Sequence, residues 1–179
     1  MLGVLATTSM GWAFVFIINP STGIPVKWQS GLIPLAIKAD NAALLPGDGS
    51  TRAATIQAAA QAWNIQIGAA QFAPQIQPLS NATYGNGANE IVFATTAYGD
   101  AFDSRTLAVA IYRRDGNQTT ESDVIFNSNR AWDSYRDAQS NHGGAFDIRR
   151  VAIHELGHVL GLDHPDEATP SQFIPAIMN

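Results

Sequence analysis

The chain has 179 residues, of which 46% are hydrophobic and 14% are charged, with a formal net charge of −5 and no cysteine. This length fits one domain, and the apolar share is sufficient for a buried core, which excludes a disordered chain. The acidic balance argues against a nucleic-acid surface. Without cysteine the chain has no disulfide, no thiol nucleophile and no thiolate metal site, so a metal would have to be bound by His, Asp or Glu.

The N-terminal part of the chain carries no charged side chain before Lys27. It is apolar but is interrupted by Thr, Ser and Gly, whereas a membrane-spanning helix needs about 20 predominantly apolar residues. The pattern is more typical of a secretory signal with a small-x-small cleavage site at 11–13, although the usual basic start is missing. A buried first strand is the alternative. We expect a leader remnant at 1–13, one domain at 14–179 that begins with a strand at 14–18, and a secreted protein that does not enter the membrane.

Apolar periodicity and turn residues predict the elements that follow. The segment 31–40 is a predicted strand, in which Pro34 indicates an edge or an early position. Ser50 is the predicted N-cap of a helix at 51–64 with one apolar face. The segment 68–88 has only a weak pattern. Three further strands are predicted at 89–96, 106–113 and 122–127.

A second helix is predicted to begin near Asp147 and to end at Gly161. An aspartate suits the first turn of a helix because its charge complements the helix dipole. Glycine suits the end because it enters the left-handed region without steric cost. A strand, a helix, several strands and another helix indicate a layered α/β or α+β domain.

The sequence HELGHVLGLDH begins inside this second helix and holds three of the four histidines. His154 and His158 are one helical turn apart and share a face, so both imidazoles can bind one ion. The turn at Gly161 can return His164 as a third ligand. Glu155 is rotated off the ligand face and is suited to contact a water on the metal. Three protein ligands and a water are typical of a catalytic zinc site.

Two alternatives compete with a catalytic zinc site. An ordinary core helix would explain one satisfied histidine, but not this spacing of three histidines, a glutamate and a glycine. A zinc site that only holds the fold together would be closed by a fourth protein ligand. Because the chain has no cysteine, His142 or a carboxylate would have to supply that ligand. Otherwise His142 is expected to be a solvated loop residue.

The motif resembles the zinc signature of the metzincin metalloendopeptidases, and its flanks are most similar to the matrixin branch. The run FDIRRVAIHELGHVLGLDHP is similar along its whole length, as are the strand SDVIFN and the RAW that follows it. PAIMN resembles the Met-turn, with Met178 as the methionine that packs beneath the zinc without binding it. The resemblance covers the chain from Val26 onward. It implies a zincin-like catalytic domain, with a twisted mixed sheet of about five strands, two long helices and the active-site helix at 147–160, in a chain that stops soon after the Met-turn.

The sequence departs from the animal matrixins at the positions of their second, structural zinc. Tyr98, Val109 and Ile125 stand where that zinc would have histidine ligands, so we expect a single, catalytic zinc. Asp100 matches a remaining ligand position, and Asp100 with Asp103 could help to bind Ca²⁺, although loop aspartates are more often turn formers. The family's inhibitory cysteine is absent because the chain has no cysteine.

These features predict a secreted, monomeric zinc endopeptidase that cleaves protein or peptide substrates, with Glu155 as the general base. The resemblance implies that substrate pairs antiparallel with the strand that contains Leu107, Ala108, Val109 and Ala110. Asp163 is predicted either to orient the site from behind the ligands or to be a polar residue at the helix end. The alternative function is a secreted zinc-binding module of the same fold without catalysis.

Overall fold

The computed structural model describes residues 15–167 and Met178. The predicted leader at 1–13 and the rest of the segment that resembles the Met-turn lie outside the described residues. In chain order the elements are β1 (Val15–Phe16), β2 (Gly31–Ile37), α1 (Arg52–Asn64), β3 (Ala70–Ile76), β4 (Glu90–Ala94), β5 (Thr96–Ala97), β6 (Asp100–Ala101), β7 (Ala108–Asp115), β8 (Gln118–Asn127), β9 (Trp132–Asp133), η1 (Gln139–His142), β10 (Phe146–Asp147), α2 (Ile148–Val159), β11 (Leu162–Asp163) and η2 (Pro165–Glu167).

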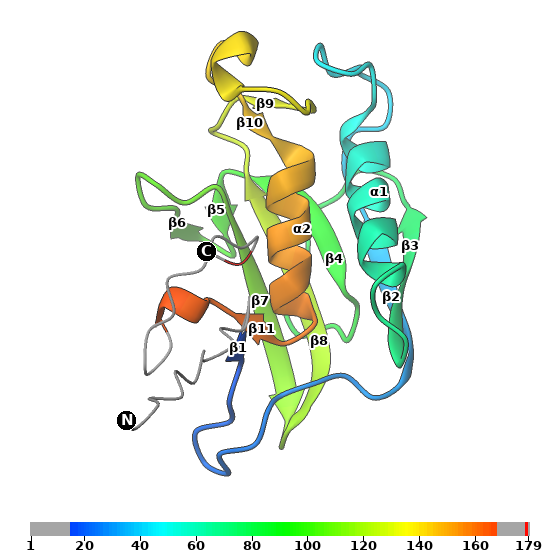
Figure 1. Cartoon of the computed structure of the whole chain (residues 1–179), viewed down its shortest axis with the longest axis vertical. Coiled ribbons are helices and arrows are strands. Elements are labelled where there is room, and N and C mark those ends of the chain that lie inside the picture. The colour runs from blue at the N-terminus through cyan, green and yellow to red at the C-terminus, as the bar shows by residue number, and fades with distance from the viewer. Residues whose placement is uncertain (1–14, 168–177, 179) are drawn as a thin grey trace, which may run out of the picture.

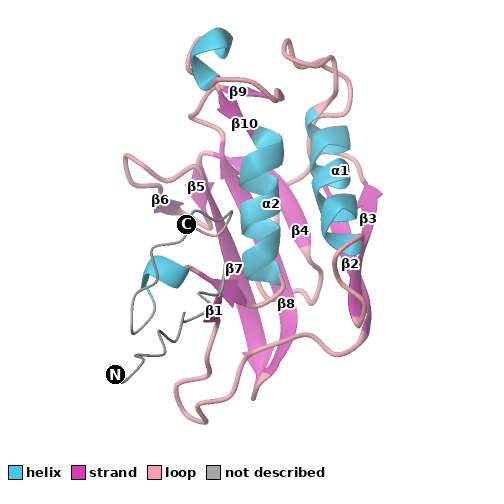
Figure 2. Cartoon of the chain, in the orientation of Figure 1, coloured by secondary structure: helices cyan, strands magenta, loops and turns pink. Residues whose placement is uncertain are grey.

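Five strands form one mixed sheet in the order β3-β2-β4-β8-β7. The first four run parallel, and β7 joins the edge of the sheet antiparallel to β8. Helices α1 and α2 lie side by side against one face of this sheet (Figure 1). The predicted α/β domain, with about five strands in a mixed sheet and two long helices, is therefore confirmed. Figure 2 shows how much of the chain around these elements is loop.

The core lies between the two helices and the sheet. Helix α1 presents small side chains to it, which lets α2 and the strands approach closely. Two tryptophans form hydrogen bonds to the backbone of α2. Trp63 Nε1, from α1, donates to the carbonyl of Ile153 at 2.9 Å, and Trp28 Nε1, from the loop before β2, donates to that of Val159 at 2.7 Å. The buried core residues from the helices and the sheet include Ile33, Leu35, Ile37, Ala53, Ile56, Ala59, Ala60, Phe72, Ile91, Phe126, Ala152, Leu156 and Val159.

The first helix begins one residue later than predicted. Thr51, not Ser50, is the N-cap: its backbone is extended and its hydroxyl accepts from the N–H of Ala54 at 3.1 Å. The Ser50 hydroxyl instead contacts Thr55 Oγ1 at 2.7 Å and donates to Asp48 at 2.5 Å. Both residues are good caps, and the local turn that Asp48 makes decided between them.

Strand β3 was missed, and β2 is an interior strand although Pro34 suggested an edge or an early position. The Pro34 carbonyl accepts from the side chain of Asn89, and pairing of β2 with β4 begins only at Ala36. Pro34 is paired with β3, and its missing N–H would face the β4 side, where the ladder has not yet started. Pro74 weakened the sequence pattern of β3, but β3 is an edge strand with one open side, where proline is tolerated.

The segment 114–121, between the strands predicted at 106–113 and 122–127, is mostly paired strand. Strands β7 and β8 pair as far as Asp115 and Gln118, with an irregularity between Arg113 and Arg114. Gly116 turns the hairpin with a φ of 57°. Within the described residues, neither helix is long and apolar enough to cross a membrane.

Candidate metal centre

The metal-binding histidines predicted from the sequence are positioned by the end of α2. Asp147 caps the start of this helix by accepting from the N–H of Arg149 at 3.1 Å. Gly161 follows the helix with a φ of 89°, and a Cβ at this position would lie 2.4 Å from the carbonyl oxygen of Val26. Glycine is therefore required at this position for two reasons: the left-handed backbone conformation, and the carbonyl of Val26, which leaves no room for a Cβ. The reversed chain continues as β11 and brings His164 back beside the helix.

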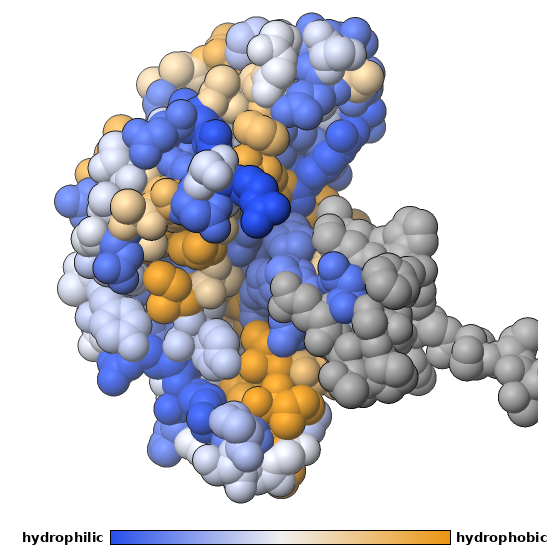
Figure 3. Space-filling view, turned by 90° about the vertical axis from the view of Figure 1, so that its left-hand side faces the viewer, coloured by the Kyte–Doolittle hydropathy of each residue, from blue (hydrophilic) through white to orange (hydrophobic). Residues whose placement is uncertain are grey.

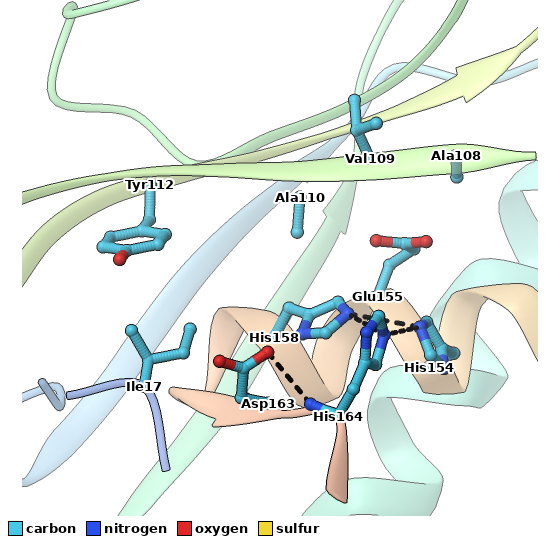
Figure 4. A pocket seen from close by; sticks show the side chains of 10 residues that line it. All are labelled: Ile17, Ala108, Val109, Ala110, Tyr112, His154, Glu155, His158, Asp163 and His164. Atoms are coloured by element: carbon cyan, nitrogen blue, oxygen red, sulfur yellow. Dashed lines mark hydrogen bonds between the residues drawn. The ribbon is translucent and has the colours of Figure 1, made fainter. Parts of the chain in front are cut away.

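The three imidazoles of His154, His158 and His164 converge on one point (Figure 4). The Nε2 atom of His158 lies 3.2 Å from that of His154 and 3.1 Å from that of His164, and the third separation is 3.1 Å. Zinc bonds of about 2.0–2.1 Å in tetrahedral geometry separate two ligand atoms by roughly 3.3 Å, so this spacing fits one zinc ion.

The proton of one imidazole is fixed by the backbone. His158 Nδ1 lies 2.9 Å from the carbonyl oxygen of Leu162, which can only accept a hydrogen bond. The Nδ1 atom therefore carries the proton and Nε2 presents a lone pair to the point of convergence, as a metal ligand must. Among residues 15–167 and Met178, these three histidines are the group of His, Asp and Glu side chains whose ligand atoms are close enough to hold a metal.

Glu155 lies beside the histidines and between α2 and strand β7 (Figure 4). Its side chain is buried, and burial raises the pKa of the carboxyl to about 7, while the backbone N–H of Ala110 acts in the opposite direction by hydrogen bonding. A divalent cation bound next to the carboxyl would favour its ionised form and lower this pKa. The carboxyl thus has a position and a proton affinity that suit exchange of a proton with a water molecule.

Met178 packs against the helix that carries the ligands. It is 1% exposed, and a Cβ placed on Gly157 would lie 2.4 Å from its sulfur atom. Gly157 stands between His154 and His158 in the sequence, so the methionine supports the helix directly behind the ligands. Gly157 was not singled out from the sequence, although a glycine inside a helix is costly and often marks a close approach.

Two cavities open between α2 and the edge strand β7. One has a volume of about 390 Å³ and the other of about 580 Å³, and both are bordered by His154, Glu155 and His164. The predicted substrate-edge residues of the strand line one or both cavities, namely Leu107, Ala108, Val109 and Ala110. The space-filling view shows a hollow on this side of the molecule, with hydrophilic residues at its floor and apolar residues below it (Figure 3).

The first cavity also contains residues that the sequence pattern did not identify. Ile17 follows β1, and its N–H donates to the carbonyl of Gly161 at 2.8 Å, so β1 and β11 pair next to the ligands. Tyr112 extends from β7 over the same cavity (Figure 4). Asp163 accepts from the backbone N–H of His164 at 2.9 Å, a contact that holds the turn. Ile17 belongs to the strand predicted at 14–18, but its place in the cavity was not predicted, because pairing of β1 with β11 is a long-range contact.

The positions that depart from the structural zinc site form other contacts. Val109 and Ile125 are directly paired across β7 and β8, and aliphatic side chains cannot ligate a metal. The Tyr98 hydroxyl donates to the carboxylate of Asp123. Asp100 and Asp103 are both exposed, and Asp103 accepts from the N–H groups of Arg105 and Thr106 at 2.6 Å and 2.8 Å, as a turn-forming aspartate does. Neither belongs to a described group of three metal-ligating side chains.

His142 is not the solvated loop residue that was expected. Its Nδ1 lies 2.9 Å from Asp133 and its Nε2 lies 2.6 Å from Asp137, while its ring stacks on Tyr135 with 3.9 Å between centroids. It does not belong to the described group around His154, so the candidate for a fourth histidine ligand is bound elsewhere.

Comparison with known proteins agrees with this architecture. Residues 27–177 match the family model of the matrixins. The chain is 33% identical over 149 residues to matrix metalloproteinase-16 of Homo sapiens, which covers 80% of this chain and 22% of that protein. It is 35% identical over 79 residues to matrix metalloproteinase-2 of Drosophila melanogaster, which covers 42% of this chain and 10% of that protein. The chain thus spans only a minor part of the length of these relatives. The match along most of the chain, on a mixed five-stranded sheet with a histidine triad, establishes that the protein belongs to the matrixin family.

Proposed function

We propose that this protein is a zinc-dependent endopeptidase. The observation that carries the proposal is the set of three Nε2 atoms within 3.2 Å of one another, with the buried carboxyl of Glu155 beside them and cavities open on the same side. Three protein ligands with an accessible fourth position are typical of catalytic zinc sites. The family membership supports the same activity, since the relatives named above are metalloproteinases.

The residues of the chain have separate tasks in this reaction. His154, His158 and His164 would hold a zinc ion, which when bound would supply Lewis acidity for a water molecule and a carbonyl group. Glu155 accepts the proton of the attacking water as the oxygen bonds to the scissile carbonyl carbon. When the C–N bond breaks, Glu155 returns this proton to the leaving amine. The net result is hydrolysis of one peptide bond, with Glu155 restored.

The substrate would bind along β7. This strand ends the sheet, so its outer N–H and C=O groups can pair with an extended peptide, and antiparallel pairing is the more stable arrangement. The four residues at 107–110 border the cavities next to the histidines. A protein or peptide is therefore the proposed substrate, and we propose that the enzyme acts as a secreted monomer.

The alternative, a zinc module without catalysis, would be closed by a fourth protein ligand. His142, the candidate histidine, is held by Asp133 and Asp137 instead. Glu155 lies toward Ala110 on β7, Asp163 accepts from the backbone N–H of His164, and no carboxyl of the described residues is grouped with the triad as a ligand. These observations favour a catalytic zinc site over a zinc-binding module without catalysis.

The test is to compare the zinc-loaded protein with its Glu155→Gln variant for zinc content and for cleavage of casein or gelatin. We expect one zinc per chain in both, and loss of about 10²–10⁴-fold or more in activity for the variant, because an amide cannot accept the proton. His158→Ala is the contrasting variant, which should lose zinc itself. Equal cleavage by zinc-loaded Glu155→Gln would refute the assigned mechanism. A zinc-loaded protein that cleaves none of a broad peptide library would favour the module, and two zinc equivalents would contradict the single site.

A further inference from the structure

We propose that the cavity beyond the histidines selects a basic side chain, Lys or Arg, at the third residue before the scissile bond, and that Asp163 is the residue that determines this preference. The inference rests on the proposed function, because it assigns a substrate preference to the same site. It concerns the cavity of about 390 Å³ that lies toward the C-terminal end of β7.

The cavity has an acidic group and two apolar walls. Asp163 is half-buried, and one carboxylate oxygen is fixed by the N–H of His164 at 2.9 Å. The other oxygen points away from His164, toward the side of the cavity where Ile17 and Tyr112 lie (Figure 4). No Lys or Arg is present among the ten described residues that line this cavity.

The charge differs at the other end of the site. The neighbouring cavity of about 580 Å³ is lined by Arg105 and Arg150, and its acidic lining residue, Glu155, is one that both cavities have in common. The two cavities share His154 and His164, so a peptide that crosses the site passes from the end with Asp163 to the end with two arginines. Such a gradient distinguishes the two directions along a substrate and opposes a cation at the wrong end.

The register follows from the spacing along β7. Glu155, which acts on the water, lies next to Ala110. Tyr112 is two residues further along the strand, about 6.8 Å away, and on the same face. A peptide that pairs antiparallel with β7 runs in the opposite direction. If its residue before the scissile bond lies near Ala110, its third residue before that bond lies near Tyr112. The second residue before the bond points to the other face.

A basic side chain matches the walls of this cavity. The methylene stem of Lys or Arg can pack on Ile17 and on the ring of Tyr112, while its charged head reaches the carboxylate of Asp163. The tyrosine ring adds cation–π attraction for the head. Asp163 is half-buried, so an ion pair with its carboxylate is screened less than one between fully exposed groups.

The competing explanation is that Asp163 serves only the turn before His164. Asp163→Asn separates the two roles, because the amide oxygen can still accept from the N–H of His164 while the charge is lost. Asp166→Asn is the matched control. It removes the same charge three residues further on, from an exposed side chain that does not line the cavity.

The experiment measures binding, so that it does not depend on turnover. Acetylated tripeptide hydroxamates, in which the hydroxamate binds the zinc, place their three residues on the N-terminal side of the scissile bond. Lys and its uncharged analogue norleucine are compared at the first residue of the tripeptide, which is the third before the hydroxamate, and again at the second residue. Calorimetry on the zinc-loaded protein and on both variants gives the dissociation constants, and cleavage of a peptide library is measured on the same preparations.

We expect Lys to bind about five- to tenfold more tightly than norleucine at the third position and not at the second, with the ratio falling as salt is added. Asp163→Asn should bring the ratio close to one, and Asp166→Asn should keep it. Equal binding of Lys and norleucine by the unchanged protein, a preference at the second position, or a preference that survives Asp163→Asn would each overturn the inference. The first two of these outcomes are measured on the unchanged protein alone, so they do not depend on whether a variant folds. Cleavage without this preference would leave the proposed function standing, whereas the preference without any cleavage would count against the function alone.

Discussion

The hydroxyl of Tyr98 donates a hydrogen bond to one oxygen of Asp123, and the other oxygen of Asp123 accepts from the backbone N–H of Glu90 at 2.7 Å. Tyr98 has a φ of 53°, which is uncommon for a residue with a side chain. The bond joins the loop after β5 to the buried strand β8 at one of the positions where animal matrixins are expected to bind a structural zinc. In this chain the tyrosine–aspartate pair makes a connection between these two segments without a metal ligand.

This pair predicts a pH dependence of stability. Burial raises the pKa of Asp123 from 3.8 to about 6. Between these values the folded state binds a proton that the unfolded state has released, so the contribution of Asp123 to stability is greatest at low pH and decreases as the pH rises toward 6. In Asp123→Asn the amide oxygen can still accept from the N–H of Glu90, the amide NH₂ can donate to the Tyr98 hydroxyl oxygen, and the side chain cannot ionise. We expect its stability relative to the unchanged protein to increase by roughly 1–2 kcal/mol between about pH 4 and pH 6.5.

Urea unfolding of both proteins across this range measures the difference. Taking the difference between variant and parent removes the contributions of other groups, including Glu155. A stability difference that stays constant with pH would show that Asp123 titrates normally.

His142 predicts a second pH effect, with its own range. Hydrogen bonding to Asp137 raises the pKa of His142, and a contact with Asp133 adds to this although desolvation opposes it. The stabilisation is therefore fully present below the unfolded value of 6.5 and is lost as the pH rises through the raised folded value. We expect His142→Gln to lower the thermal midpoint most at about pH 6 and less at about pH 9.

Titration of the His142 ring by nuclear magnetic resonance tests the cause directly. Asp137→Asn should shift the pKa of His142 back toward 6.5, because Asp137 contributes most to the rise. An unchanged titration curve in this variant would mean that Asp133 alone sets the pKa.

We expect a side chain at position 157 to clash with Met178, and a smaller residue at position 178 to relieve this clash. Gly157→Ala would place a methyl group 2.4 Å from the sulfur of Met178, so one of them must move. We expect a loss of about 1–3 kcal/mol in unfolding free energy, as for other overpacked cores. In the double variant with Met178→Ala the additional cost of Gly157→Ala should largely disappear. Additive effects in this double-mutant cycle would contradict the contact between the two residues.

Gly161 predicts an effect on metal affinity as well as on stability. Gly161→Ala forces a side chain into a left-handed conformation and toward the carbonyl of Val26, so the turn that returns His164 is displaced. We expect at least about tenfold weaker zinc binding, measured by chelator competition. Gly23→Ala is the control, since Gly23 has a φ of 70° but a Cβ added there would meet nothing within 4 Å. It should lose about 1 kcal/mol of stability and keep its zinc affinity. Equal zinc affinities in the two variants would show that the turn does not position His164.

The sequence by itself determined the elements whose residues are close together in the chain. The spacing of His154 and His158 on one helix, the cap at Asp147 and the turn at Gly161 depend on local geometry, which repeats in every helix that carries this pattern. The order of strands and helices likewise indicated a layered α/β or α+β domain, because each segment carries its own periodicity, and the family resemblance added the mixed sheet.

Only the tertiary structure decided the contacts between distant segments. Ile17 lies in the cavity because β1 pairs with β11, at the other end of the described chain; the sequence predicted a strand at 14–18, but not the strand it pairs with. Tyr112 and Asp163 come to the same cavity from different elements for the same reason. The sequence predicted His142 to be a solvated loop residue, but the fold places it against Asp133. The sequence did not distinguish Gly157 from other helix positions, and the fold packs Met178 against it. A long-range contact depends on how whole helices and strands pack against one another, and a local sequence pattern does not predict that packing.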